Sequence, residues 1–332
     1  MTTKSLYQVV ADLDKYPLSL PEQVSILQNY HTLLVPGIPT PLGYVPSALI
    51  TTHPEQWPPS LWTITPRSIT LMTPPTAPAA TRTATLASAL RHMAVSSHPD
   101  FRSLKGWRDE TFPVYGPGGD LVLEIERAAS ALFGVVTYGV QLQPSTSTPT
   151  PIQTPPTHPP TTTPEGINLW IATRSPHKQA YPNMLDTTAA GGLPTSLSPL
   201  SAIIAEATDE AGMPADLLQK IEFVDRISYF HINDNGNGMA VLQPEVEYCF
   251  ELELPEEEGV APRPGDGEVQ GFGLWATERV VEELRAGGFK PNSAVVVVEF
   301  LRRWGVVAGG DVEGVWERLH RVLPLPVVDH GV

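Results

Sequence analysis

The stretch GGLPTSLSPLSAIIAEATDEAGMP, from Gly191 to Pro214, decides how the chain is interpreted. It carries the end signals of a helix. Ser198 is a favourable N-cap residue, Pro199 occupies the first helical position, where proline is well tolerated, and Gly212 follows the last turn. Between these signals, apolar residues recur at helical spacing and predict a face that packs on a sheet. They are Leu200, Ile203, Ile204, Ala207 and Ala211.

Three carboxylates gather at the end of this predicted helix, at Glu206, Asp209 and Glu210. The helix dipole is already negative there, so acidic side chains destabilise the helix unless they are solvated or bind a cation. Glu206 and Glu210 have i,i+4 spacing and lie on one side of the helix, with Asp209 near the same rim. Oxygen ligands without basic neighbours suit a hard divalent cation such as Mg²⁺, with Mn²⁺ as an alternative. By helix geometry alone, a solvated acidic helix end explains the pattern too, and it is the more frequent case.

The chain of 332 residues carries a net charge of -15, from 21 basic and 36 acidic residues. Its length allows two domains, and its hydrophobic share of 41% with 17% charged residues is typical of a globular protein. An acidic chain without clustered Lys and Arg is a poor partner for nucleic acid or for an anionic membrane surface. We therefore expect neither as the main partner. A phosphorylated small molecule stays compatible with this charge if a metal ion supplies positive charge locally.

The cysteine content and the start of the chain bear on its compartment. Cys249 is the single cysteine, so no disulfide can form within the chain, which argues against a secreted scaffold. The start, MTTKSLYQVVADLDKYP, has no apolar segment of signal-peptide type and is not Arg-rich like a transit peptide. The longest apolar run, from Ala294 to Val298, is too short to cross a bilayer. These features predict a soluble protein with a cytoplasmic location.

The sharpest change in composition lies at PSTSTPTPIQTPPTHPPTTTP, from Pro144 to Pro164. It consists almost entirely of Pro, Thr and Ser, and so little apolar surface does not repay the entropy of ordering. The segment is predicted to be a disordered or polyproline-like linker, or else a loop between two strands of a hairpin. The predicted domains are residues 1–143 and 166–325, separated by this linker at 144–165. A second stretch, from Thr73 to Thr85, is predicted to be a surface insertion in the first domain.

The periodicity of apolar residues predicts the remaining elements. Before the linker, helices are predicted over 5–16 and 86–95 and strands over 61–66 and 121–126, with 134–143 as the neighbour of the last strand. After it, strands are predicted over 167–174, 221–232 and 245–254, and helices over 278–288 and 292–305. Alternation in the strand over 245–254 turns its four glutamates to a face that is expected to be wet. This order of elements predicts an α+β fold, with an α/β/α sandwich after the linker.

The glycine pair, loop, helix and terminal E-x-x-[DE]-E-x-G of the opening stretch resemble the Nudix box, the loop-helix-loop motif of the Nudix hydrolases. The positions that carry the resemblance are Gly191, Glu206, Ala207, Asp209, Glu210, Gly212 and Met213. Three positions depart from the motif: Leu197 stands at its first glutamate, Ala205 at its arginine, and Asp209 replaces a glutamate. In the motif the arginine braces the carboxylates. Its absence therefore bears on the orientation of the ligands rather than on metal binding itself.

Longer segments around the box resemble one subfamily, the Nudix proteins related to, and sometimes fused with, thiamin pyrophosphokinase. After the linker, the segments that carry the resemblance are residues 170–194, 242–255, 265–272 and 289–292. Before the linker, residues 104–116 and 124–140 resemble the companion module of that subfamily. The resemblance implies a C-terminal Nudix domain with an α/β/α sandwich, preceded by a smaller α+β companion domain.

The same resemblance implies a reaction, the hydrolysis of a diphosphate bond in a small molecule, with oxidised thiamin diphosphate cut to the monophosphate. Glu206 and Glu210 would hold Mg²⁺, Asp209 would assist them, and the ion would position or activate a water. Glu268 matches a downstream acid that some Nudix enzymes place opposite the metal, and a surface carboxylate in a loop explains it equally well. Two alternatives stay open. One is hydrolysis of another nucleoside diphosphate derivative such as ADP-ribose, and the other is a catalytically weak binding module.

Further residues are predicted to meet the substrate. Arg174 and Lys178, just after the first strand of the second domain, are placed to clamp phosphate oxygens, although exposed basic loop residues are common. Backbone N–H groups of Gly191 and Gly192 can approach a phosphate because no Cβ atom intervenes, and a tight turn explains both glycines almost as well. Gln243 lies in a segment that resembles the subfamily and is expected to line the site. The predicted partners are a small-molecule diphosphate substrate and, as an alternative to a monomer, a second copy of the chain in a homodimer.

Overall fold

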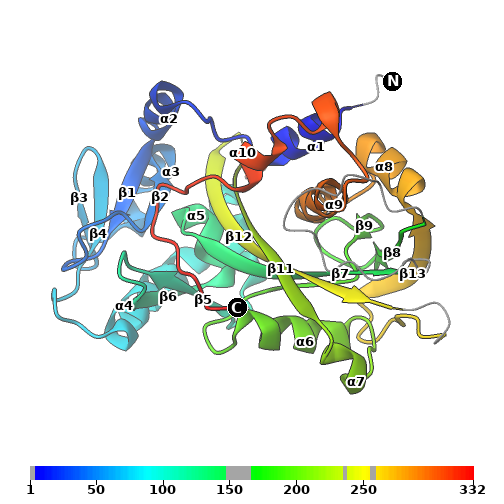
Figure 1. The fold of residues 1–332 in the computed structure, drawn as a ribbon. Helices are drawn as coiled ribbons and strands as arrows, with labels where there is room; N and C mark the ends of the chain where they lie inside the picture. The colour runs from blue at the N-terminus through cyan, green and yellow to red at the C-terminus, as the bar shows by residue number, and fades with distance from the viewer. Residues whose placement is uncertain (1–3, 147–165, 235–237, 255–258) are drawn as a thin grey trace.

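The computed structural model describes residues 4–146, 166–234, 238–254 and 259–332. In these ranges the chain forms a large mixed sheet with helices on both faces. Beside it lies a smaller group of strands and helices, which the N-terminal part of the chain supplies (Figure 1). The predicted α+β fold class is confirmed.

The large sheet has seven strands in the described residues. Its main path runs in the order β11 (Glu222–Asp234), β12 (Ala240–Glu253), β7 (Thr137–Thr146), β8 (Asn168–Arg174) and β13 (Val269–Ala276). Two short strands join this path from the side: β10 (Ala189–Gly192) pairs with β7, and β9 (Leu185–Asp186) pairs with β8. Strands β12 and β7 run parallel, and the other pairs of this sheet run antiparallel.

Helices cover both faces of this sheet. On one face, Ile203 of α6 (Pro199–Asp209) and Leu217 of α7 (Ala215–Leu218) share a core with Val140 of β7 and Phe250 of β12. On the other face, a second core holds Leu169 of β8 together with residues of four helices. These helices are α1 (Leu6–Leu13), α8 (Thr277–Ala286), α9 (Pro291–Arg303) and α10 (Val315–Leu319). The arrangement is an α/β/α sandwich, which confirms that prediction.

The smaller group, here called the N-terminal module, comprises residues 20–133. Its four-stranded sheet has the order β2–β1–β4–β3, and the hairpin β5–β6 stands beside that sheet. Its core contains Trp57, Trp62 and Phe133, whose rings pack on one another. In chain order its elements are α2 (Leu20–Leu27), β1 (Tyr30–Leu34), β2 (Gly43–Pro46), α3 (Ser47–Thr52), β3 (Trp62–Ile64), β4 (Ser68–Leu71), α4 (Ala79–Ala94), β5 (Thr111–Tyr115), β6 (Leu121–Glu126) and α5 (Ser130–Phe133).

Strand β7 departs from the sequence prediction. Residues 134–143 do not pair with 121–126, because β6 pairs with β5 and β7 lies between β12 and β8 in the large sheet. The predicted domain boundary at residue 143 therefore falls inside a strand of the sandwich. Helix α1 also packs with α9, so both ends of the predicted first domain contribute to the sandwich. Alternation along one strand identifies its faces but not its partner, which is why the pairing was predicted wrongly.

Most of the Pro-, Thr- and Ser-rich segment lies outside the described residues, at 147–165. The strands on either side of it pair antiparallel, with Ser145 opposite Leu169 and Thr146 opposite Asn168. The segment therefore connects two neighbouring strands of one sheet, as the second of its two sequence interpretations proposed. The prediction of disorder falls on residues outside the described ranges.

Helix α4 begins earlier than the sequence predicted. Part of the expected surface insertion at 73–85 is helical, since α4 starts at Ala79, directly after Pro78. The side chain of Arg82 is buried and donates hydrogen bonds to the carbonyl oxygens of Pro75 (2.9 Å) and Pro36 (3.4 Å). Alanines favour a helix, and these bonds anchor its first turns to the module, which the local sequence does not reveal.

Most of the acidic face of β12 is covered rather than wet, and of its four glutamates Glu253 is exposed. Helix α9 covers it, and Glu247 and Glu251 are only 2% and 7% exposed. Glu247 accepts hydrogen bonds from Asn292 and from the Tyr229 hydroxyl, each at 3.2 Å, and Glu251 pairs with Arg303 at the end of α9. The predicted alternation is present. The prediction of a solvated face is wrong because polar partners on α9 and β11 allow these carboxylates to be covered.

Candidate active site

Helix α6 begins and ends where the sequence indicated. The Ser198 hydroxyl accepts a hydrogen bond from the N–H of Ser201, and Gly212 has a φ of +56°, in the left-handed region that favours glycine. The buried residues of the helix pack toward the sheet and fix its rotation about its own axis. They are Pro199, Ala202, Ile203 and Ala207. With this rotation, Glu206 and Glu210 both face strand β10.

Strand β10 is shaped to receive these two carboxylates. A Cβ atom at Gly191 would overlap Oε1 and Cδ of Glu206, so a larger residue there would displace that side chain. The N–H of Ala190 donates a hydrogen bond of 3.0 Å to Oε2 of Glu210, which is buried. The structure thus explains Gly191 by the space that Glu206 needs. Contact between its N–H group and a phosphate stays a prediction.

The surroundings disfavour the charges of both glutamates. Burial raises the pKa of Glu206 to about 7, and the negative charges of Glu268 and Asp209 add to the shift. Burial also raises the pKa of Glu210 to about 8, with the charge of Glu206 adding to it and the N–H of Ala190 opposing it. Carboxylates that are pushed toward protonation near neutral pH gain strongly from a cation that replaces the proton. The site therefore combines hard oxygen donors with a shortage of positive charge.

Asp209 lies at the rim of this group and is exposed. Its backbone carbonyl oxygen faces Gly265, where a Cβ atom would overlap it, so the loop before β13 is held close to the end of α6. Ala205 is exposed on the same helix and carries no group that could brace Asp209. The role of Asp209 as a metal ligand stays a prediction.

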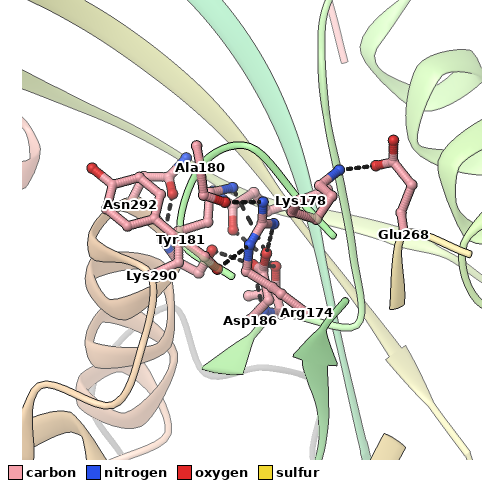
Figure 2. Close-up of polar contacts among 12 residues, drawn as sticks. Arg174, Lys178, Ala180, Tyr181, Asp186, Glu268, Lys290 and Asn292 are labelled. Atoms are coloured by element: carbon pink, nitrogen blue, oxygen red, sulfur yellow. Dashed lines mark hydrogen bonds and ion pairs between the residues drawn. The ribbon is translucent and has the colours of Figure 1, made fainter. Parts of the chain in front are cut away.

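Glu268 joins the group from a different segment, directly before β13. Its carboxylate forms an ion pair with Lys178 (Figure 2). Burial raises the pKa of Glu268, but the hydrogen bond and the charge of Lys178 outweigh that effect, so its pKa lies below the ordinary value. A hydrogen bond with Glu210 acts in the same direction. The structure thus brings Glu268, Glu210 and Lys178 together, with Lys178 bound to a carboxylate.

Arg174 has a structural role in the loop after β8. It is buried, and its guanidinium donates to Oδ2 of Asp186 at 2.6 Å and to the carbonyl oxygens of Ala180 (2.9 Å) and Tyr181 (3.0 Å) (Figure 2). These bonds use three nitrogens of the side chain and hold the loop between β8 and β9. The guanidinium is enclosed and its donors are engaged, so contact of Arg174 with a phosphate stays a prediction that these bonds disfavour.

Gly192 and Gln243 lie in different surroundings. A Cβ atom at Gly192 would approach two ring carbons of Phe112 in β5 to 2.8 Å, so this glycine lets the N-terminal module come close to β10. Gln243 lies in β12 opposite His231, and strand β7 separates β12 from β10. Contact of either residue with a substrate stays a prediction.

Sequence reasoning missed Arg127, in the short turn after β6. This residue belongs to the N-terminal module, yet its positive charge lowers the pKa of Glu206 in α6. It forms an ion pair with Glu110 and lies over the ring of Phe112. A single arginine in a turn has no recognisable motif, and the segment 124–140 pointed only to the module as a whole. The contact between the module and β10 is what identifies it.

A second acidic group was also missed, on the face of the sheet beneath α9. The hydroxyl of Tyr229 donates to Glu245 at 2.5 Å and lies 3.2 Å from Glu247. Burial raises the pKa of both glutamates, that of Glu247 to about 8. Glu245 and Glu247 were missed because the sequence analysis expected the glutamates of this strand to face solvent.

In the described residues, two other groups have metal-ligand atoms within 4.8 Å of one another: His53, His98 and Asp100, and Asp225, Glu299 and His320. The carboxylates of α6 and Glu268 do not meet that spacing as a set. In the two other groups, atoms that could bind a metal ion already have partners within the protein. His53 forms a hydrogen bond of 2.8 Å with Asp100, and Glu299 forms an ion pair with Arg302.

Sequence comparison finds relatives for both parts of the chain. A family described as a domain of unknown function, DUF4743, matches residues 20–137. An uncharacterized protein of Saccharomyces cerevisiae is 29% identical over 236 residues, which cover 68% of this chain and 64% of that protein. Nudix hydrolase 20, chloroplastic, of Arabidopsis thaliana is 30% identical over 207 residues, which cover 61% of this chain and 49% of the plant protein.

Nudix hydrolase 24, chloroplastic, of the same plant is also 30% identical over 207 residues, covering 50% of its length. The chain is therefore related to the Nudix hydrolases, and it spans about half the length of these two plant relatives. Among solved structures, a protein from Deinococcus radiodurans covers 58% of this chain and 98% of its own, with a TM-score of 0.39 and 19% identity.

Proposed function

We propose that this chain hydrolyses a diphosphate bond in a small organic molecule and requires Mg²⁺, with Mn²⁺ as a substitute. The observation that supports this most is the meeting of Glu206, Glu210 and Glu268 beside β10. Burial raises the pKa of Glu206 and Glu210, and the negative charges around them add to the rise. Such hard oxygen donors suit Mg²⁺. The sequence relationship to two Nudix hydrolases supports the class of reaction.

The residues present fit a divalent ion. Glu206 and Glu210 would hold it on the helix side, with Asp209 assisting at the rim, and Glu268 would lie opposite them. When bound, the ion neutralises diphosphate oxygens and lowers the pKa of a water. The hydrogen bond from Ala190 fixes one oxygen of Glu210 before any substrate binds. Lys178 keeps Glu268 ionised, which is the state that a base needs.

The hydrolytic step joins the oxygen of a water to one phosphorus atom and breaks the bond from that phosphorus to the bridging oxygen. The water loses a proton in this step. Glu268 is the proposed acceptor, because it is ionised at neutral pH and its side chain is 44% exposed, so a water can reach it. Glu206 and Glu210 are the proposed ligands of the ion, and the rate of hydrolysis depends on them as well as on Glu268.

For the substrate we propose oxidised thiamin diphosphate, such as its oxo and oxy forms, cut to the monophosphate. The segments that resemble the thiamin pyrophosphokinase-related subfamily support this choice, above all residues 104–116, 124–140 and 242–255. Loss of the positive thiazolium charge distinguishes the oxidised forms from intact thiamin diphosphate. Hydrolysis of ADP-ribose is the alternative reaction, and a binding module without turnover is the alternative class.

A panel of diphosphates tests this proposal. Purified protein is assayed with Mg²⁺ against oxothiamin diphosphate, thiamin diphosphate and ADP-ribose, and kcat/KM is compared. We expect the highest value for oxothiamin diphosphate and loss of all turnover in EDTA. A clear preference for ADP-ribose would overturn the thiamin assignment and keep the reaction class, whereas no turnover of any compound would favour the binding module.

The cellular setting is also a proposal. Among the described residues, no helix combines the length and the apolar character that a membrane span needs. The names of the two plant relatives include the word chloroplastic, so they do not decide between compartments. The cytoplasmic location, the homodimer and the absence of a nucleic-acid partner stay predictions.

A further inference from the structure

We propose that Arg127 of the N-terminal module is a phosphate-binding residue of the diphosphate site. The inference rests on the proposed function and deepens it. It assigns one half of the substrate-binding surface to a module that carries none of the box residues. The argument depends on where the turn after β6 lies, on the charge of the site and on the donors that Arg127 has free.

The N-terminal module reaches strand β10 at Gly192. Phe112 lies so close that a Cβ atom on Gly192 would be 2.8 Å from its ring, and Oε1 of Glu110 would be 4.0 Å from the same atom. The guanidinium of Arg127 lies 5.6 Å from the centre of the Phe112 ring, and the N–H of Arg127 donates to the carbonyl of Glu110 at 2.8 Å. Arg127 therefore lies near β10, on the side of Gly192. The preceding residue of that strand, Gly191, is the one against which Glu206 packs.

The charge of Arg127 acts on the carboxylates from this position. Burial raises the pKa of Glu206 and of Glu245 on β12, and the charge of Arg127 opposes both rises. Helix α6 contains no Lys or Arg, since its sequence is PLSAIIAEATD, with Ala205 directly before Glu206. A diphosphate adds more negative charge to a site that is already acidic, so a cation from outside the helix is needed there besides the metal ion.

Three other cations near this site are already engaged by carboxylates. Arg174 is enclosed and bound to Asp186, Lys178 pairs with Glu268, and Lys290 is 18% exposed beside Asp186. The side chain of Arg127 is 40% exposed, and its bonds to Glu110, of 2.9 and 3.1 Å, both come from NH1.

In the part of the chain that the structure describes, Nε and NH2 of Arg127 make no hydrogen bond. These two donors lie in one plane, with the spacing that matches two oxygens of a phosphate group. Arg127 thus offers a free pair of donors at the edge of the carboxylate group, which neither lysine does.

The test measures binding of methylenediphosphonate, a diphosphate analogue that cannot be hydrolysed, to the full chain in Mg²⁺ by calorimetry. Arg127→Gln should raise Kd at least about tenfold, because a charge-assisted pair of bonds is lost, and Arg127→Lys should recover part of that loss. With the diphosphate that the protein hydrolyses best, Arg127→Gln should raise KM and leave kcat within about threefold. Arg91→Gln is the matched control, since Arg91 is another arginine of the module that lies over an aromatic ring, that of Trp107.

Glu110→Gln separates binding from a structural role. It breaks the same ion pair as Arg127→Gln but leaves the guanidinium free, so Kd should stay equal or fall. Two results would overturn the inference: an unchanged Kd in Arg127→Gln, or an equal rise of Kd in Glu110→Gln, which would make the pair a structural brace. Either result leaves the proposed function intact if the wild type still hydrolyses a diphosphate. Failure of the wild type to bind the diphosphonate and to hydrolyse any diphosphate would remove both.

Discussion

The buried carboxylate of Glu210 favours the binding of a cation, and its charge destabilises the folded chain when no cation is bound. It is 8% exposed, and burial raises its pKa to about 8, with the charges of Glu206, Asp186 and Glu268 adding to the rise. Glu210→Gln keeps the shape and removes the charge. We expect kcat/KM to fall at least about 100-fold, while the melting temperature of the metal-free protein rises by a few degrees.

Enzyme assays in Mg²⁺ and thermal melts in EDTA measure these two effects. Glu282→Gln is a matched control, because Glu282 is an exposed glutamate of α8. It should change neither quantity. Undiminished turnover in Glu210→Gln would exclude Glu210 as an ion ligand.

The pH dependence follows from Glu206 and Glu210 together. Both pKa values are raised above the ordinary 4.5, to about 7 and about 8, so the metal-free folded chain binds protons that the unfolded chain has released. The contribution of these groups to stability is therefore fully present below pH 4.5 and is lost as the pH rises through about 7 and 8.

Mg²⁺ competes with protons for Glu206 and Glu210, so its affinity should increase as the pH rises, whereas the stability of the metal-free chain decreases. We expect binding to be roughly tenfold tighter at about pH 8.5 than at about pH 6, with release of protons on binding. Calorimetric titrations in two buffers of different ionisation enthalpy measure both effects. Equal affinity at the two pH values would place the ion elsewhere.

At the scale of elements, local signals predicted the helix α6 and its ends well. Ser198, Pro199 and Gly212 act within one or two turns, and the apolar face of the helix follows from its own spacing. The partner of β7 could not be predicted in the same way, because it is β12, which follows later in the chain. The burial of Glu247 and Glu251 likewise depends on Asn292 and Arg303, which α9 brings over the strand.

The candidate site residues also divide into those set by local spacing and those set by contacts between distant segments. The spacing of Glu206 and Glu210 within one helix suffices to place them side by side. Arg174 could not be judged from sequence, because its partner Asp186 and the carbonyl groups that bind it come from a folded loop. Arg127 could be recognised as a site residue only from the packing of Phe112 on Gly192, which joins the N-terminal module to the sandwich.

The connection between β7 and β8 gives a prediction at this scale. Thr146 and Asn168 are opposite each other in an antiparallel pair, so a short turn can close the two strands. Replacing residues 148–164 by a five-residue Gly- and Asn-containing turn should change the melting temperature by less than about 2 °C, since shortening a loop lowers its closure entropy only slightly. Thermal melts measure the change. A large drop would show that residues 148–164 contribute to the stability of the fold.

At the scale of the whole molecule, the sandwich and the N-terminal module share contacts at several places. The hydroxyl of Tyr115 in β5 and that of Tyr248 in β12 both bond to His330, so the C-terminal segment contacts both parts. Phe112 and Arg127 reach β10 from the module. The N-terminal module is thus part of the framework that holds the carboxylate site.

Strand β7 leaves the ribosome well before β12, with which it later pairs from Thr137 to Ser145. Until β12 has been synthesised, the nascent chain exposes an apolar strand with an open edge, and such edges associate with other chains. A chain that ends at residue 146 should therefore aggregate during expression, whereas one that ends at residue 136 should stay in solution, because the core of the N-terminal module is nearly complete by then. Light scattering of the two products at equal concentration compares them, and equal solubility would mean that the edge of β7 is protected in another way. Late closure of this edge would make the protein dependent on a chaperone while it is being made.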